Sequence, residues 1–304
     1  MIIYDSFSKD RDNFMNKKIL VTGATGLIGK ETLPFLLGKG YEVYATSITN
    51  VSDDLINWVE CDICDSKSLK DLLEKIKPEY LLHFAWITGG DYLTNETNLL
   101  LRDAGENLIK MFKENGGKRA VYAGTCFEYD MDGRVIKESN NLNPKTLYAQ
   151  CKNELREYCE SFAKENNLSF GWGRIFYVYG QNEKSSRLTA KVIETLKNNQ
   201  EFYLGAPDNY LDYMYTKDIA QAFIALLESY YDGAVNICTG HGVYLKDYVL
   251  KIQELMNKQG LIKYDSNKEN ALNIVGDNTV LTSVVGYTPQ YTIETGLREI
   301  ILNI

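Results

Sequence analysis

The chain has 304 residues, 44% of them hydrophobic and 24% charged, which is enough for one large globular domain or a domain with an added lobe. Its formal net charge of −8 argues against nucleic acid or an anionic membrane surface as a partner. The first residues lack the pattern of a secretory signal, and no stretch approaches the roughly 20 apolar residues of a membrane span. We therefore expect a cytoplasmic protein.

Apolar and amphipathic segments alternate from Lys18 onward. Residues 1–16 are polar and without clear periodicity, so they are interpreted as an extension ahead of the fold. The patterns then predict strands at 19–21, 42–46, 59–63, 80–84, 119–123 and 170–176, and helices at 27–37, 66–76, 95–115 and 147–166. Strands and helices that alternate at this spacing need parallel crossovers, which predicts a doubly wound parallel sheet of the Rossmann type.

The pattern changes after Gly180, where a second, smaller C-terminal α/β lobe is predicted to begin. A helix is expected at 185–197, a polar loop at 205–210, a helix at 218–228 and a strand at 234–238. We assign residues 17–180, with 211–240 returning, to a dinucleotide-binding domain. Residues 181–210 and 241–304 are assigned to a lobe that binds substrate.

A glycine-rich turn follows the first predicted strand and opens the first predicted helix. In this context glycines let backbone amides and the helix N-terminus approach a pyrophosphate. The spacing is G-x-x-G-x-x-G, whereas the usual dinucleotide fingerprint is G-x-G-x-x-G. A plain structural turn is the alternative. The predicted cofactor contacts from this turn are Gly23, Thr25, Gly26, Leu27, Ile28 and Gly29.

The end of the second predicted strand carries Thr46 and Ser47 and no carboxylate. An acidic side chain there would bind the adenosine ribose and repel a 2′-phosphate, so the sequence favours NADP over NAD, although no arginine stands ready to bind that phosphate. Asp62, followed by Ile63, is placed either to meet the adenine or to cap a surface turn. Phe84 ends the fourth predicted strand and Ala85 follows it, and both can line the nicotinamide side.

Tyr148 and Lys152 are four residues apart in one predicted helix, so their side chains share a face. A phenol is a poor acid or base at neutral pH unless a nearby ammonium lowers its pKa, and Lys152 is placed to do this. Thr125, after an apolar strand, can hold a substrate oxygen while Tyr148 passes a proton. The alternative is that Tyr148, one of the 22 tyrosines of the chain, only packs on a helix face and that Lys152 is a solvated neighbour.

Cysteine and histidine usage gives little support to a metal site. Cys61 and Cys64 have C-x-x-C spacing, but no second pair follows and the chain has only two histidines, so we predict reduced cysteines and no metal. The segment from Trp86 to Tyr92, with Thr88 inside it, forms either a substrate-side loop over the reacting carbon or a packed turn.

Several motifs together resemble the extended short-chain dehydrogenase/reductases, from Lys18 nearly to the end of the chain. They are T-G-A-T-G-L-I-G at 22–29, Asp62, H-F-A at 83–85, G-T-C-F-E-Y-D at 124–130, Y-A-Q-C-K at 148–152, R-I-F-Y-V-Y-G at 174–180, Y-L-D-Y-M-Y-T-K-D-I-A at 210–220 and G-Y-T-P-Q at 286–290.

This resemblance implies an NAD(P) domain, a lobe that holds a nucleotide-diphosphate sugar, and a homodimer formed through the helices that begin near Asn95 and Tyr148. It gives Thr125, Tyr148 and Lys152 the catalytic roles, with Lys152 also bonding the nicotinamide ribose. The segment at 124–130 is most similar to the 4-ketoreductase and synthase branch, which supplies deoxysugars or heptoses for surface polysaccharides.

Two departures from the family pattern narrow the chemistry. Cys126 and Phe127 stand where the dehydratases carry an Asp-Glu pair, and they cannot act as acid and base at neutral pH, so dehydration is disfavoured. Leu211, before Asp212, replaces an arginine that contacts substrate phosphate, so a cation from elsewhere must take its place. The predicted substrate contacts are Trp86, Thr88, Cys126, Phe127, Arg174, Arg187 and Tyr213, with Arg174 or Arg187 supplying that charge.

Three functions follow from these residues. The first hypothesis is NADPH-dependent reduction of a 4-keto nucleotide-diphosphate sugar at C4. The second is an NAD-dependent 4-epimerase or 4-dehydrogenase of a nucleotide sugar, because the same three side chains serve hydride removal and return. The third is a catalytically silent NADP-binding regulator, against which the spacing of Tyr148 and Lys152 counts.

Overall fold

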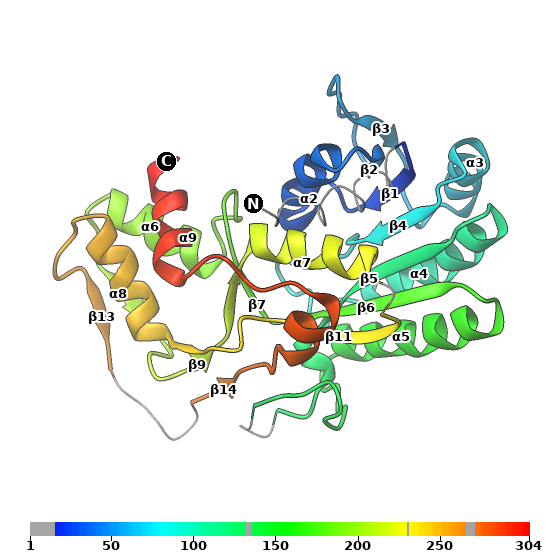
Figure 1. Ribbon diagram of the computed structural model, residues 1–304. Helices are drawn as coiled ribbons and strands as arrows, with labels where there is room; N and C mark the ends of the chain where they lie inside the picture. The colour runs from blue at the N-terminus through cyan, green and yellow to red at the C-terminus, as the bar shows by residue number, and fades with distance from the viewer. Residues whose placement is uncertain (1–15, 132–134, 230, 266–270) are drawn as a thin grey trace, which may run out of the picture.

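The computed structural model describes residues 16–131, 135–229, 231–265 and 271–304, and it shows a large α/β part beside a smaller lobe (Figure 1). The predicted extension at 1–16 lies, apart from its last residue, outside the described residues. Among the described helices, none is both long and apolar enough to cross a membrane.

The described residues form a central sheet of seven parallel strands in the order β11-β6-β5-β4-β1-β2-β3. This confirms the predicted doubly wound fold. The order reverses between β1 and β4, and such a reversal opens a crevice at the carboxyl ends of the strands. The strands are β1 (Lys18–Thr22), β2 (Glu42–Ser47), β3 (Asn57–Glu60), β4 (Tyr80–His83), β5 (Arg119–Thr125), β6 (Ser169–Ile175) and β11 (Gly233–Ile237).

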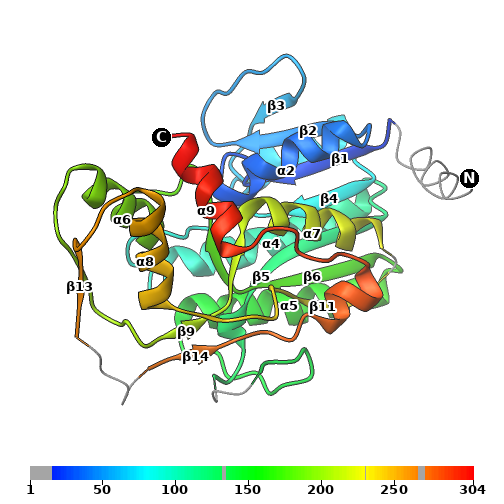
Figure 2. The same cartoon turned by 60° about the vertical axis from the view of Figure 1, so that its left-hand side comes forward.

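Helices cover both faces of this sheet, as Figures 1 and 2 show from two sides. On one face α2 (Leu27–Gly38) packs beside α7 (Thr216–Glu228), and their apolar side chains join one core cluster. On the other face α3 (Ser66–Ile76), α4 (Thr97–Glu114) and α5 (Leu147–Glu165) share a second cluster. Helices α3, α4 and α5 each bury one apolar stripe, as the sequence periodicity predicts, whereas α7 is buried on most of its sides.

Helix α3 illustrates how the sequence produces these elements. Its buried residues, Leu69, Leu72, Leu73 and Ile76, recur at the spacing of one helical face. Asp65 caps its N-terminus by accepting a hydrogen bond from the backbone N–H of Lys67. The cap and the stripe together fix where the helix begins and which side faces the sheet.

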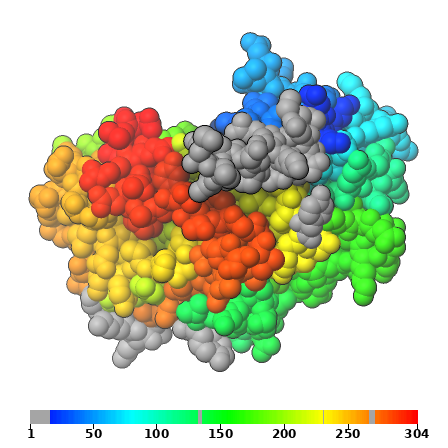
Figure 3. All heavy atoms as spheres, in the orientation of Figure 1, coloured from blue at the N-terminus to red at the C-terminus, as the bar shows by residue number. Residues whose placement is uncertain are grey.

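The smaller lobe gathers around its own apolar cluster, which includes Val192, Tyr248 and Leu297. Figure 3 shows its later segments, in gold and red, at the left of the molecule. Its helices are α6 (Leu188–Lys197), α8 (Leu245–Leu255) and α9 (Ile293–Leu302). Short strands pair between them: β8 (Phe202–Leu204) with β13 (Ile262–Tyr264), and β9 (Tyr210–Leu211) with β12 (Val243–Tyr244) and β14 (Asn273–Ile274).

Several boundaries differ from the sequence prediction, and three of them have a local cause. Strand β3 ends at Glu60 and not at residue 63, because Asp62 turns the chain by accepting a hydrogen bond from the N–H of Cys64. The polar loop expected at 205–210 stops short, because Tyr210 already pairs in β9. Helix α6 begins at Leu188 and not at residue 185, since Arg187 has extended backbone geometry.

The domain boundaries drawn from sequence stay a proposal, but two segments lie elsewhere than expected. Leu211 belongs to β9 and to the lobe cluster, and the next strand, β10 (Tyr213–Tyr215), pairs with β7 (Tyr177–Tyr179). The helical turn η2 (Leu281–Val285), expected in the lobe, packs on α7 instead. A turn this short is not assigned by periodicity.

Candidate active site

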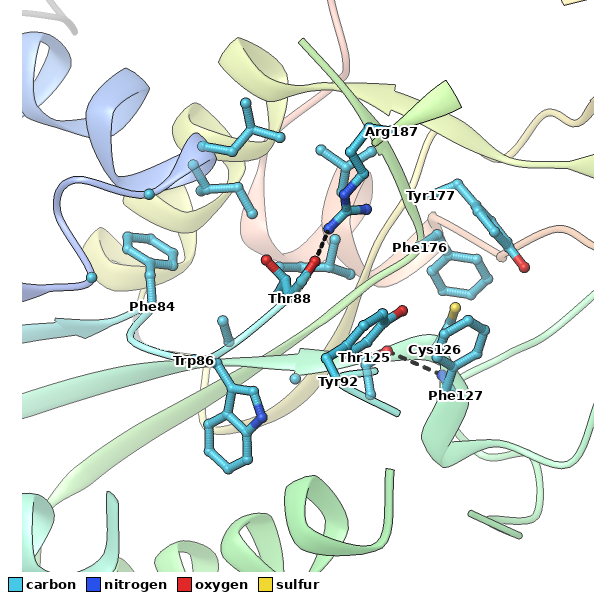
Figure 4. A pocket seen from close by; sticks show the side chains of 18 of the residues that line it. Phe84, Trp86, Thr88, Tyr92, Thr125, Cys126, Phe127, Phe176, Tyr177 and Arg187 are labelled. Atoms are coloured by element: carbon cyan, nitrogen blue, oxygen red, sulfur yellow. Dashed lines mark hydrogen bonds between the residues drawn. The ribbon is translucent and has the colours of Figure 1, made fainter. Parts of the chain in front are cut away.

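A pocket opens at the point where the strand order reverses and runs from the carboxyl ends of β1, β4 and β5 to β7 and α6. In Figure 4, Phe84 lies on one side, Phe127, Phe176 and Tyr177 on the other, and Thr125 between them. Most residues predicted for the site line this pocket: Gly23, Gly26, Leu27, Ile28, Gly29, Phe84, Trp86, Thr88, Thr125, Cys126, Phe127, Tyr148, Lys152, Arg187 and Tyr213.

The glycine turn forms one end of the pocket through its backbone. Gly23 has a positive φ of +68°, and a Cβ there would lie 2.5 Å from the backbone N of Ala85. A Cβ on Gly29 would lie 2.3 Å from the carbonyl oxygen of Gly23. Gly26 precedes α2, and no side chain of the described residues caps this helix. The first N–H groups of α2 are therefore available to an anion such as a pyrophosphate.

The residues predicted for the adenosine end, all described, lie outside the pocket lining. Thr46 and Ser47 are buried at the end of β2, and Ser47 accepts a hydrogen bond from the N–H of Thr49 at 3.1 Å. Glu60 is the register partner of Ser47 on β3, so a carboxylate does lie beside this strand end. Sequence order alone did not reveal that neighbour.

Four other predicted residues differ in exposure. Asp62 is exposed and uses one carboxylate oxygen in its own turn. Ile63 and Ala85 belong to a small apolar cluster that also contains Trp86. Thr25 is exposed in the glycine turn. The contact of Asp62 with an adenine stays a prediction.

Thr125, Tyr148 and Lys152 lie together on the wall of the pocket. Thr125 ends β5, its N–H donates to Glu128 Oε1 at 2.8 Å, and its hydroxyl accepts from the N–H of Phe127 at 3.3 Å. Tyr148 and Lys152 come from the first turns of α5, which Thr146 caps. Their exposed fractions are only 8% and 3%.

Burial dominates the protonation of both α5 residues. It raises the pKa of Tyr148, although a hydrogen bond with Thr125 acts in the opposite direction. It lowers the pKa of Lys152 to about 7, partly offset by the negative charge of Glu128. Among the described residues, Lys152 is not one of the groups that shift the pKa of Tyr148, so the lowering expected from it is not seen. Lys152 Nζ donates to the carbonyl oxygen of Ala123 at 2.8 Å. Tyr148 is thus a neutral phenol at neutral pH.

The far end of the pocket is aromatic. Phe127 and Tyr177 meet edge to face at 6.3 Å between ring centroids, and Tyr177 lies 5.4 Å from Tyr213. Cys126 is buried among them, and burial raises the pKa of its thiol, so it cannot act as a base at neutral pH. Arg187 reaches the pocket and donates to the carbonyl oxygen of Thr88 at 2.9 Å (Figure 4).

Arg174 does not supply a charge to this pocket, which corrects one predicted substrate contact. It is 2% exposed and donates from Nε to Glu128 Oε2 at 2.7 Å. Its other donor contacts the hydroxyl of Tyr129 at 2.8 Å, and its guanidinium lies over that ring. A buried guanidinium needs such partners, and the carboxylate of Glu128 neutralises its charge. Leu211, at the missing arginine position, is buried in the lobe cluster.

The structure adds pocket residues that the sequence did not single out. Tyr92 comes from the segment 86–92 that the sequence placed beside the reacting carbon, and its ring meets Tyr148 edge to face at 5.1 Å. Glu183 comes from the chain between β7 and α6, and Thr189 from the first turn of α6. Glu183 Oε2 is buried and has no hydrogen-bond partner among the described residues. No pattern in the sequence marks this carboxylate.

Comparisons with known proteins give a consistent assignment. Residues 19–238 match the model of the NAD dependent epimerase/dehydratase family. The CDP-abequose synthase of Salmonella muenchen is 23% identical over 305 residues, which cover 94% of this chain and 98% of that protein. The dTDP-4-dehydro-6-deoxyglucose reductase of Escherichia coli is 24% identical over 313 residues, with coverage of 94% and 97%.

Among solved structures, the UDP-glucose 4-epimerase of Thermotoga maritima, determined with UDP-glucose, superposes with a TM-score of 0.85. The two chains are 22% identical, and the superposition covers 94% of this chain and 99% of that one. A likeness at this identity shows the shared fold.

Proposed function

Because the chain belongs to the NAD dependent epimerase/dehydratase family, we propose that it reduces a 4-keto nucleotide-diphosphate sugar at C4 with NADPH. It is an NAD(P)-dependent enzyme of the extended short-chain dehydrogenase/reductase type. Full-length relatives named as a 4-dehydro-sugar reductase and as a synthase of a nucleotide-linked sugar support reduction. The substrates of these relatives suggest a deoxysugar.

The observation that carries the proposal is the neutral phenol of Tyr148 beside the hydroxyl of Thr125. Burial raises the pKa of Tyr148, so its proton is present at neutral pH. Reduction of a ketone ends with a proton on the former carbonyl oxygen and needs an acid, whereas oxidation of an alcohol needs a base. A protonated Tyr148 can supply the proton that reduction needs.

The chain's own residues divide the reaction between them. Thr125 Oγ1 and Tyr148 Oη hydrogen-bond the carbonyl oxygen at C4 and orient it. The reduced nicotinamide, when bound, supplies the hydride to C4. As the carbonyl π pair moves onto oxygen, that oxygen takes the proton from Tyr148 Oη. Lys152 stabilises the resulting phenolate by its positive charge until a proton from solvent restores the phenol.

The residues at the cofactor end fit a dinucleotide. A side chain at Gly23 would collide with Ala85, and the uncapped first turn of α2 presents N–H groups to a pyrophosphate. The absence of a carboxylate at Thr46 and Ser47, both described, supports NADPH as the preferred cofactor. Glu60 beside Ser47 opposes that preference. The rates with NADPH and with NADH therefore both have to be measured.

Arg187 is our candidate for the cation that takes the place of the arginine expected at position 211. It lines the pocket, it is only half-buried, and it donates to a carbonyl oxygen and not to a carboxylate. Its remaining donors can therefore serve a substrate diphosphate, which needs a cationic partner when it leaves water.

The test is to incubate the purified protein with NADPH, and separately NADH, and a panel of 4-keto nucleotide sugars while following absorbance of the reduced cofactor. We expect oxidation of NADPH with at least one sugar. No oxidation, together with interconversion of C4 epimers or reduction of added NAD by a 4-hydroxy sugar, would favour the epimerase or dehydrogenase alternative. Cofactor binding without any turnover would favour the regulator.

We also propose that two copies associate through α4 and α5. Leu99 and Leu100 on α4 are 37% and 61% exposed, and α5 carries the stacked pair Tyr158 and Phe162. Apolar side chains on two adjacent helices can form the centre of a two-fold interface. Light scattering should give twice the chain mass for the wild type and the monomer mass for Leu100→Glu. A monomeric wild type would contradict the proposal.

A further inference from the structure

The ammonium of Lys152 is buried without a full ionic partner. Among the described residues no carboxylate comes within ion-pairing distance, and Nζ donates to a single acceptor, the carbonyl oxygen of Ala123 at 2.8 Å. A buried cation of this kind tends to lose its proton. The role of Lys152 in the proposed reaction, however, needs the charged form.

The indole of Trp86 supplies a second contact. Lys152 Nζ lies 3.7 Å from the centroid of the Trp86 ring, well inside the roughly 6 Å over which a cation is attracted to an aromatic face. Tryptophan is the side chain that provides the strongest attraction of this type, and it is largest where water is excluded. The edge of the same indole also meets the Tyr148 ring, with 6.3 Å between centroids.

Asn98 fixes the orientation of this indole. Trp86 Nε1 donates to Asn98 Oδ1 at 2.7 Å, so the polar edge of the ring points to the start of α4. Asn98 is fully buried, and its amide donates to the carbonyl oxygens of Tyr92 and Asn95, each at 2.7 Å. A ring held in this way cannot turn its face from Lys152 without breaking buried hydrogen bonds.

The other ionisable groups around Lys152 do not remove the need for this contact. Glu128 favours the charged lysine, but it is itself paired with Arg174 at 2.7 Å. His83 is fully buried with its pKa lowered, so it is neutral, and it accepts from or donates to Thr22 at 2.7 Å. Tyr148, on the same helix, is a neutral phenol.

We infer that Trp86 is a positioning residue, whose indole face, fixed by Asn98, keeps the Lys152 ammonium charged and directed at the pocket wall. It was predicted from sequence to contact substrate, and the geometry gives it this additional role toward Lys152. The part of the inference that concerns turnover rests on the proposed function. The part that concerns the charge of Lys152 does not.

The first test is independent of turnover and uses tryptophan emission as a function of pH. The chain has three tryptophans, so the Trp86 component is the difference between the wild type and Trp86→Phe. We expect this component to change in one step as Lys152 loses its proton, and the step to vanish in Lys152→Met. An identical pH profile of the Trp86 component with and without Lys152 would overturn the inference even if no substrate is ever found.

The second test measures the pH dependence of turnover. Activity should fall on the alkaline side as Lys152 loses its proton, and Trp86→Leu should move that limb to lower pH by about one unit, because the cation loses its aromatic partner. Trp86→Phe, which keeps a smaller face, should shift it less. Trp58→Leu is the matched control at the far edge strand β3 and should leave the limb in place.

A structural role would give a different result. If Trp86 only packs, Trp86→Leu lowers thermal stability and total activity while the alkaline limb stays where the wild type has it. That outcome overturns the inference. If Trp86→Leu does not fold, the emission test and the shift in Trp86→Phe decide between the two roles.

Discussion

The two ends of the pocket are built in different ways. The cofactor end consists of backbone from one short segment, the turn at 22–29. This turn approaches the chain after β4 so closely that a Cβ on Gly23 would lie 2.5 Å from the backbone N of Ala85. The substrate end is made of side chains from segments far apart in sequence, among them Phe127, Tyr177, Arg187 and Tyr213.

This difference explains which residue substitutions each end of the pocket tolerates. A site made of backbone and glycines depends on conformations that few residues can adopt, so it tolerates little change. A site made of side chains on separate elements can exchange one residue for another and still keep the fold. Leu211 in place of the phosphate-contacting arginine that the family resemblance implies would be a change of the second kind.

The largest expected effect lies where the two ends meet. Tyr148→Phe removes the proton donor while the ring and its packing remain, so turnover should fall by about 10²–10⁴-fold. Cofactor affinity, measured by fluorescence titration with NADPH, should stay within about twofold because the glycine turn is untouched. Wild-type turnover in this variant would place the proton donor elsewhere.

The next largest effect should distinguish the two arginines predicted from sequence, Arg174 and Arg187, by their contributions to stability. Arg174→Leu leaves the buried carboxylate of Glu128 without its partner and should lower the free energy of unfolding by about 3–5 kcal/mol in a urea titration. Arg187→Leu should change that free energy by less than about 1 kcal/mol, because this side chain is half-buried. Unchanged stability in Arg174→Leu, with weaker substrate binding, would return Arg174 to the substrate site.

The rigidity of the cofactor end is tested by substituting two glycines, one in the turn before α2 and one at the end of α2. Gly23→Ala combines a positive φ of +68° with a collision against backbone, so NADPH affinity should fall by about tenfold or more. Gly38→Ala is the matched control, since a Cβ there meets nothing within 4 Å, and its affinity should equal that of the wild type. Equal affinities in both variants would contradict a backbone-built site.

The smallest effect is expected at the substrate end. Arg187→Leu should raise KM by about tenfold and change kcat little, because a diphosphate contact acts on the ground state and the transition state alike. Arg187→Lys should recover part of the affinity. Arg298→Leu, on exposed α9, is the control and should leave KM unchanged. An unaltered KM in Arg187→Leu would remove Arg187 from the phosphate site.

Sequence patterns located the parts of the site that depend on spacing within one element. One pocket is lined by three parts that the spacing indicated. They are Thr125 at the end of β5, Tyr148 and Lys152 one turn apart on α5, and the glycine turn. The parallel sheet followed from the same periodicities. These features are local, so a sequence can reveal them.

Features that depend on a distant partner were not accessible in this way. Arg174 looked like a free cation in a cleft strand, and only the fold shows that Glu128 neutralises it. The pKa of Tyr148 was expected to fall, and the structure raises it because burial outweighs the hydrogen bond with Thr125. Trp86 was placed near the substrate, but its contact with Lys152 depends on Asn98 of α4.

The central claim, a C4 reduction with a proton from Tyr148, is tested most directly by isotope transfer. The purified protein is incubated with NADPH deuterated at the transferable position and a 4-keto nucleotide sugar, and the product is examined by NMR. The account predicts one deuterium at C4 for each cofactor oxidised, and no product from Tyr148→Phe on the same timescale. No deuterium at C4 and no cofactor consumed with the 4-keto sugar, together with inversion at C4 of a 4-hydroxy nucleotide sugar in a parallel incubation, would contradict it.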